Sequence, residues 1–282
     1  MVHRGRLAQP GRCQFRGAAG RHHLETDPRR CDAVTPDHCA ELLRDADPDR
    51  FACVLAAEPR DRGRLATLYA ANLEIAQAAL ASKEPLIAQM RLQWWADQIG
   101  AMSEGSAPLR HDVATPLFAA WGPAIAPLVK LIEARRHDAM REAFQSEVAV
   151  LNYIDGCTGT LMRLAAQACG LTGQEQLIAN QARGAGLAAW LGAYPSLRAL
   201  HLGLEDDSPA RLADLAAPGL AALDSARRAR PRPPRRAAPA LFAGAGARRK
   251  LRAIRDGKAV QISEFSVKYA YTALALWGRW QG

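Results

Sequence analysis

The fold of this chain is indicated most clearly by residues 65–80, which read LATLYAANLEIAQAAL. Leu65, Leu68, Asn72, Ile75 and Ala79 recur at spacings of three and four, which is the pattern of an amphipathic helix. Five of the eleven remaining positions are alanine, the residue with the highest helix propensity, and small side chains allow neighbouring helices to pack closely. The stretch therefore predicts a helix of the core.

Helical spacing continues on both sides of this stretch. Pro85 opens a helix whose face carries Leu86, Met90 and Trp94. Further helices are predicted from near Pro127 past Phe144, from 148 to 162 with interruptions at Gly156 and Gly159, over 176–191, over 212–223 with a break at Pro218-Gly219, and over 241–256 and 265–280. No β-alternation of useful length and no internal repeat is present. The sequence predicts one all-α domain, a helical bundle.

Composition narrows the class of protein. With 282 residues, of which 49% are hydrophobic, the chain can bury a substantial core. No apolar run approaches the roughly 20 residues that span a bilayer, so no membrane-spanning helix is expected. The six cysteines form no Cys-x-x-Cys pair and no zinc-ligand spacing, which predicts free structural thiols and a cytoplasmic location.

The first 33 residues are rich in Arg, Gly and His and lack apolar periodicity, which predicts a disordered basic tail. Val34 can come from a GTG start codon if the source is bacterial, so we expect residues 1–33 to lie upstream of the true start. Thr35 and Pro36 then form a helix N-terminus, and the domain is expected to span residues 34–282.

The net charge of +9 is concentrated in one segment. Twelve cations and one acid lie between Arg227 and Lys258, and residues 227–239 form a basic, Pro-rich connector. Two interpretations compete: a solvated connector, or contact with an anionic membrane or a partner. Nucleic acid is not expected as a partner, because Phe242 is the only aromatic residue in this basic segment that could stack on a base. The candidate contact residues are Arg227, Arg228, Arg230, Arg232, Arg235 and Arg236.

Four stretches, in this order, resemble the squalene/phytoene synthase family. They are Asp47–Phe51 with Arg64–Ala70, Met90–Trp95, Leu131–Asp138 with Tyr153 and Thr158-Gly159, and Gly186–Leu191. Members of this family are head-to-head prenyl synthases. The resemblance implies the all-helical isoprenoid-synthase fold over residues 34–282.

The chain departs from the family where its chemistry resides. Two Asp-rich motifs on facing helices hold the magnesium ions that grip the substrate diphosphate, because Mg²⁺ requires several hard oxygen ligands. The corresponding residues here are Ala76, Gln77 and Leu80 in the first motif and Ala185, Ala189 and Ala193 in the second. We therefore expect no cofactor and no catalysis. The resemblance extends to a phytoene-synthase-like subgroup that assists assembly of respiratory complex I, so a lipid-binding or membrane-complex assembly role is expected.

Two alternatives remain open. The chain can be an active, Mg-dependent prenyltransferase that uses Glu74 and Asp138 as catalytic residues, or a nucleic-acid-associated protein acting through the basic segment. Glu74 can equally be a surface acid in an ion pair, and Asp138 can pair with Arg135 or Arg141 at helical spacing. The expected ligands are a polyprenyl lipid or an isoprenoid diphosphate, and the expected partners are an anionic membrane, with the protein peripheral on the inner membrane, or respiratory complex subunits. The candidate cavity residues are Tyr69, Asn72, Gln77, Trp94, Tyr153, Thr158 and Trp190, although core packing also accounts for the tryptophans.

Overall fold

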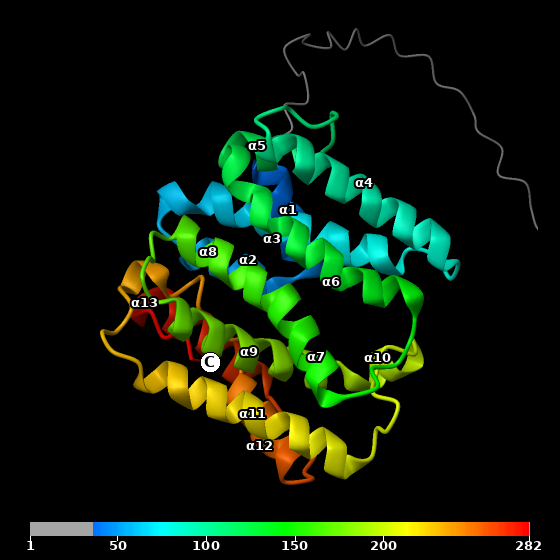
Figure 1. Cartoon of the computed structure of the whole chain (residues 1–282). Coiled ribbons are helices and arrows are strands. Elements are labelled where there is room, and N and C mark those ends of the chain that lie inside the picture. The colour runs from blue at the N-terminus through cyan, green and yellow to red at the C-terminus, as the bar shows by residue number, and fades with distance from the viewer. Residues whose placement is uncertain (1–35, 282) are drawn as a thin grey trace, which may run out of the picture. The chain divides into compact units, whose positions relative to one another are not determined.

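The computed structural model describes residues 36–281, and within this range the chain is helical, with no β-sheet (Figure 1). The elements are α1 (Pro36–Ala46), α2 (Pro48–Ala56), α3 (Pro59–Leu80), α4 (Pro85–Ser103), α5 (Ala114–Trp121), η1 (Gly122–Leu128), α6 (Val129–Met140), α7 (Glu147–Ile154), η2 (Asp155–Gly159), α8 (Thr160–Ala168), α9 (Glu175–Gly192), α10 (Tyr194–Ala199), α11 (Pro209–Arg228), η3 (Arg235–Ala237), α12 (Ala247–Arg255) and α13 (Glu264–Trp277). The all-α prediction is confirmed. The tail predicted over residues 1–33 lies outside the described residues.

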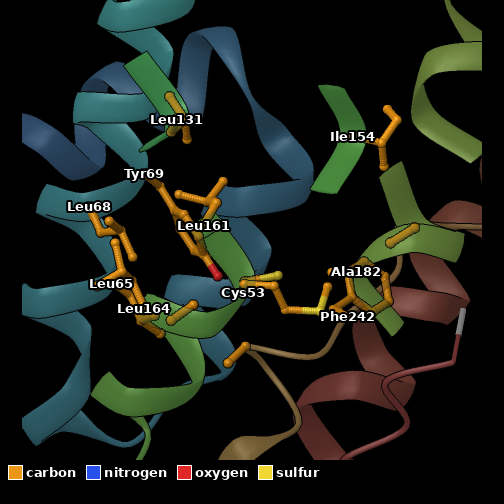
Figure 2. Packing of buried hydrophobic residues seen from close by; sticks show 14 of the residues in the cluster. Cys53, Leu65, Leu68, Tyr69, Leu131, Ile154, Leu161, Leu164, Ala182 and Phe242 are labelled. Atoms are coloured by element: carbon orange, nitrogen blue, oxygen red, sulfur yellow. The ribbon is translucent and has the colours of Figure 1, made fainter. Parts of the chain in front are cut away.

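Helix α3 lies in the core, as its sequence pattern predicts. Leu65, Leu68 and Ile75 are fully buried, and the helix contacts α1, α4, α5, α6 and α8. Figure 2 shows Tyr69 reaching from α3 toward Leu161 and Cys53 among these apolar side chains. The buried side chains of α3 thus form a surface against which the neighbouring helices pack.

The middle of the chain differs from the prediction at both ends of α6. Residues 122–128 form the 3-10 helix η1, and α6 ends at Met140, because Arg141 adopts a left-handed conformation with φ of 55°. The predicted interruption at Gly156 and Gly159 is present as a π-helix, η2, which separates α7 from α8 without a break in the helical path. A Cβ atom at Gly156 would lie 2.8 Å from the Cβ of Ala134. This glycine therefore permits close approach of α6.

Helices α9, α11 and α12 pack against one another (Figure 1). The predicted break at Pro218-Gly219 is wrong: α11 continues through Pro218, which is tolerated inside the helix. A Cβ atom at Gly184 would lie 2.9 Å from the carbonyl oxygen of Gly219, so the two glycines allow α9 and α11 to touch through their backbones. The last two helices, α12 and α13, are shorter than predicted.

Helix α4 turns its predicted face outward. Leu86 and Met90 are exposed, whereas Leu92, Trp95 and Ile99 are buried. Spacing alone identifies rows of side chains along a helix, and here the buried row is the one that begins at Ala88. The exposed residues Leu86 and Met90 belong to the row that was predicted from the sequence.

One segment, Ala114–Met140, is long and apolar enough to cross a bilayer by length and composition, with a mean hydropathy of 1.4. This corrects the expectation that no such run exists. The segment spans α5, η1 and α6, and Leu117, Ile125 and Leu131 within it are fully buried in the core. Trp121 is anchored there as well, since its indole Nε1 donates to the carbonyl oxygen of Arg64 at 3.0 Å. These contacts account for the apolar run through packing.

Candidate functional site

A central cavity of about 200 Å³ lies between α2, α3, the η2–α8 region, α9 and residues 240–244. Two of the predicted cavity residues, Tyr69 and Thr158, line it. The remaining lining is mostly small and apolar and consists of Asp47, Asp49, Arg50, Cys53, Leu161, Met162, Ala185, Gly186, Ala189, Ala240, Phe242, Ala243 and Gly244. Ligand sites for drug-sized molecules usually enclose about 300–1,000 Å³, so this cavity is small.

The charged groups of the central cavity are already paired. Arg50 Nε lies 3.0 Å from Asp47 Oδ2, and its guanidinium lies 5.1 Å from the centroid of the Tyr69 ring. Asp49 accepts a hydrogen bond from the hydroxyl of Tyr271 on α13. Burial, followed by this hydrogen bond, raises the pKa of Tyr271 well above its usual value, so its proton stays available to Asp49. Both carboxylates are thus held by protein partners.

Magnesium does not fit the lining at the position of the second motif. Ala185 and Ala189 present methyl groups to the cavity, and Gly186 between them packs so closely that a Cβ there would lie 2.8 Å from Thr158 Oγ1. Mg²⁺ requires near-octahedral oxygen coordination, which these side chains lack. Among residues 36–281, no group of three or more His, Cys, Asp or Glu side chains is arranged to hold a metal ion.

Asp138 belongs to a buried triad. Arg135 Nη1 donates to Asp138 Oδ2 at 2.8 Å and to the hydroxyl of Tyr153 at 2.6 Å, and that hydroxyl donates to Asp138 Oδ2 at 2.9 Å. Asp138 is 4% exposed. Burial alone would lower the pKa of Arg135, but the surrounding Cys157, Tyr153 and Asp138 outweigh it and raise the pKa. Of the two partners considered for Asp138, the structure selects Arg135.

Arg141, the other candidate partner, binds elsewhere. Its Nη2 donates to the carbonyl oxygens of Leu80 and Ser82 at 3.2 Å each. It therefore covers the C-terminal end of α3, close to the position of the first motif. A cation here satisfies backbone oxygens at a helix C-terminus, where positive charge is favourable.

Aromatic rings fill the region around α6, α7, α9 and α10. The ring of His137 stacks on Phe144 with centroids 3.9 Å apart, and Phe144 lies 5.3 Å from Tyr153 and 6.1 Å from Trp190. Trp190 continues the row to Tyr194 at 5.2 Å. Trp190 and Tyr153 therefore pack in the interior. They line neither the central cavity nor the second cavity, which is described below. Asn72 is buried and lines neither cavity as well.

A second cavity, of about 560 Å³, lies between the C-terminal half of α3, α4 and His111. It collects two other predicted cavity residues, Gln77 and Trp94, and the candidate catalytic residue Glu74. The complete lining is Glu74, Gln77, Ala78, Ala81, Arg91, Trp94, Trp95 and His111. Of the seven residues predicted to share one cavity, two line the central cavity, two line the second and three line neither. Glu74 and Asp138 have different partners.

The hydrogen bonds of His111 fix its orientation toward Glu74. Its Nδ1 accepts from the backbone N–H of Val113 at 3.1 Å, which assigns the proton of the neutral ring to Nε2. Nε2 lies 3.5 Å from Glu74 Oε2. Burial raises the pKa of Glu74, and the neighbouring His111 opposes this shift. Sequence reasoning missed His111 because it lies on a loop 37 positions after Glu74, without any helical spacing to connect them.

The arginines of the basic segment have different roles. Arg236 makes a bidentate ion pair with the buried Asp61, at 2.7 and 2.6 Å. Arg235 donates to the carbonyl oxygens of residues 275 and 276 at the end of α13, and Arg230 donates to carbonyls of residues 227–229. Arg227, Arg228 and Arg232 are exposed. Part of the predicted contact surface therefore holds the fold together.

The helical fold, the central cavity between α3 and α9, and the order of the motifs define a protein of the isoprenoid-synthase type. The chain belongs to the squalene/phytoene synthase family, whose model matches residues 43–191. A solved dehydrosqualene synthase in complex with a ligand superposes with a TM-score of 0.62, covering 85% of this chain and 94% of that one. Its sequence identity is 14%, so this likeness concerns the fold.

Among curated proteins, the chain is similar to complex I assembly factor 6 of NADH dehydrogenase (ubiquinone). It is 26% identical to the Bos taurus protein over 146 residues, which cover 49% of this chain and 42% of the relative. The Homo sapiens protein is 25% identical over the same length and coverage. The chain thus spans about two fifths of the length of the curated relatives that it matches.

Proposed function

We propose that this protein is a non-catalytic member of the squalene/phytoene synthase family that acts in the assembly of a respiratory membrane complex. The observation that carries the proposal is the lining of the central cavity by Ala185 and Ala189, which the resemblance to the family places in the second aspartate motif. Ionisation of an allylic diphosphate needs a metal to stabilise the leaving group, and methyl groups offer that metal no ligand.

The size of the cavity supports the same proposal. A head-to-head condensation requires two prenyl chains and two diphosphates in one site, and about 200 Å³ is below the usual volume for a single drug-sized ligand. The aromatic row through Phe144 and Trp190 and the triad around Asp138 fill the neighbouring interior. This side of the fold serves as a scaffold.

The assembly role is supported by the similarity to complex I assembly factor 6, which is 26% identical over 146 residues. Assembly of a respiratory complex does not require the assembly protein itself to be an enzyme. A surface that contacts a subunit or an assembly intermediate is sufficient, and the same bundle can provide it without its ancestral site.

Catalysis is tested directly by incubating the purified full chain with farnesyl or geranylgeranyl diphosphate and Mg²⁺ and measuring pyrophosphate release. We expect release at the rate of the protein-free control, with a dehydrosqualene synthase as the positive control. Turnover that is lost in Glu74→Gln or Asp138→Asn would establish the prenyltransferase alternative in place of this proposal.

The assembly role is tested in the source organism. Deletion of the gene is expected to lower the amount of assembled NADH dehydrogenase on native gels and the NADH-dependent quinone reduction of membranes. Complementation with the Glu74→Gln variant should restore both, because the proposal assigns no catalytic step to Glu74. Normal levels of assembled complex in the deletion strain would contradict the role.

A further inference from the structure

Helix α13 exposes a row of large apolar side chains. Phe265 is 78% exposed, Tyr269 48%, Leu276 57% and Trp277 56%. At about 3.6 residues per turn, positions 265, 269 and 276 fall on one face of the helix, in a row about 16 Å long, whereas position 277, the last residue of the helix, lies about 120° around the axis from position 265. Exposed apolar side chains gathered in this way mark an interaction surface, whereas single ones do not.

The orientation of α13 is fixed by its opposite face. Ala270, Ala273 and Leu274 are buried, and the helix packs against α2. Both of its ends are capped: the hydroxyl of Ser263 accepts from the backbone N–H of Ser266 at 3.2 Å, and Arg235 covers the carbonyls at the C-terminal end. The exposed row is therefore held outward by the fold.

Cations border this row. Arg279 Nη1 donates to the hydroxyl of Tyr269 at 3.1 Å, and its guanidinium lies 5.7 Å from the centroid of the Trp277 ring. Lys268 on α13 is exposed, and Arg235 adds another cation at the end of the helix. The acid of α13 is Glu264, which lies 3.7 Å from Lys268. The surroundings of the row are positively charged.

We propose that this face of α13 docks on an anionic lipid surface. Aromatic rings with a polar edge, such as Trp and Tyr, prefer the headgroup level of a membrane, and Arg side chains lie along apolar surface while keeping their charge in water. A bilayer with anionic headgroups presents an apolar layer beneath a negative one. Phe265 and Leu276 enter the first, while Lys268 and Arg279 meet the second.

The row and its cations favour lipid over a protein partner. The row lies on the outer face of one helix, so it can lie along a flat membrane surface. The cations around the row all favour a negatively charged partner surface. The basic connector continues this field, because Arg235 joins it to α13. The inference is independent of the proposed function, since it invokes neither catalysis nor its absence.

The test is flotation of the full chain with vesicles of seven parts phosphatidylcholine to three parts phosphatidylglycerol, compared with pure phosphatidylcholine. We expect binding to the anionic vesicles that weakens with salt. A Phe265→Ser, Leu276→Ser double variant should lose about tenfold or more of this binding. The matched control is Leu86→Ser, Met90→Ser, which removes side chains that are 72% and 65% exposed on α4 and should leave binding unchanged.

Circular dichroism and thermal melting establish that both double variants are folded before they are compared. The contribution of charge is tested with a Lys268→Glu, Arg279→Glu variant, which should lose binding to anionic vesicles. Absence of wild-type binding, or equal loss in the α4 control, would overturn the proposal. A stable dimer in solution that dissociates in the Phe265→Ser, Leu276→Ser variant would also overturn it, because a second copy would then cover the row.

Discussion

The triad of Arg135, Asp138 and Tyr153 allows a stability prediction with a stated size. Replacing Asp138 by Ala removes the carboxylate that accepts from both other members at 2.8 and 2.9 Å. The guanidinium of Arg135 is then left in the interior without its counter-charge. We expect the Asp138→Ala variant to be severely destabilised.

The magnitude follows from burial. The side chain of Asp138 is 5% exposed and that of Arg135 is 22% exposed, so water replaces little of the lost interaction. Removing one partner of such a pair costs about 3–5 kcal/mol, and for a domain of this size the melting temperature should fall by roughly 6–20 °C. On the same helix, Glu133 pairs with Arg136 at 2.8 Å but is 55% exposed. Glu133→Ala should therefore cost about 1 kcal/mol or less.

Urea denaturation followed by circular dichroism measures both variants against the wild type. A third variant, Arg135→Met, Asp138→Leu, Tyr153→Phe, replaces all polar members by apolar ones and should recover most of the lost stability, because no buried charge remains unpaired. The reasoning is refuted if Asp138→Ala and Glu133→Ala cost the same, or if the triple variant is less stable than Asp138→Ala.

Three further predictions concern packing, an ion pair and pH. Gly184→Ala should destabilise by about 1–3 kcal/mol because its Cβ has no room, whereas Gly100→Ala on α4, with nothing within 4 Å, should stabilise by up to about 1 kcal/mol; urea titration giving the same sign for both would contradict this. Arg236→Ala should lower the melting temperature by stranding its buried partner on α3, while Arg232→Ala on the exposed connector should not, and equal melting curves would refute the structural role. Burial raises the pKa of Cys157 from 9.0 to about 11. The stability that this thiol contributes is thus complete below pH 9 and lost as the pH rises toward 11, and alkylation of native Cys157 at pH 8, read by mass spectrometry, would contradict it.

This chain keeps the family fold. The positions that its resemblance to the family assigns to the two aspartate motifs carry alanine, glutamine and leucine. The candidate residues that remain, Glu74 and Asp138, are both engaged: Glu74 faces His111 and Asp138 is buried with Arg135. A carboxylate that is engaged by a protein partner gives up that contact to bind a metal, which weakens the case for either as a ligand.

The sequence alone determined the helical class, the core position of α3 and the family. Apolar spacing of three and four between Leu65 and Ala79 reports a buried helix because side chains at those intervals share one face. The absence of a carboxylate at Ala185 and Ala189 is equally a property of the sequence, since no tertiary contact can supply one there.

Only the tertiary structure decided which helix faces are buried and which distant groups meet. Leu86 and Phe265 have the same apolar character as core residues, and their exposure depends on how α4 and α13 are rotated against their neighbours. The partners of Glu74 and Asp61 lie 37 and 175 positions further along the chain. Such pairs follow from the packing of whole helices, which minimises exposed apolar area over the entire molecule. The spacing of residues within one helix does not determine how the helices pack against one another.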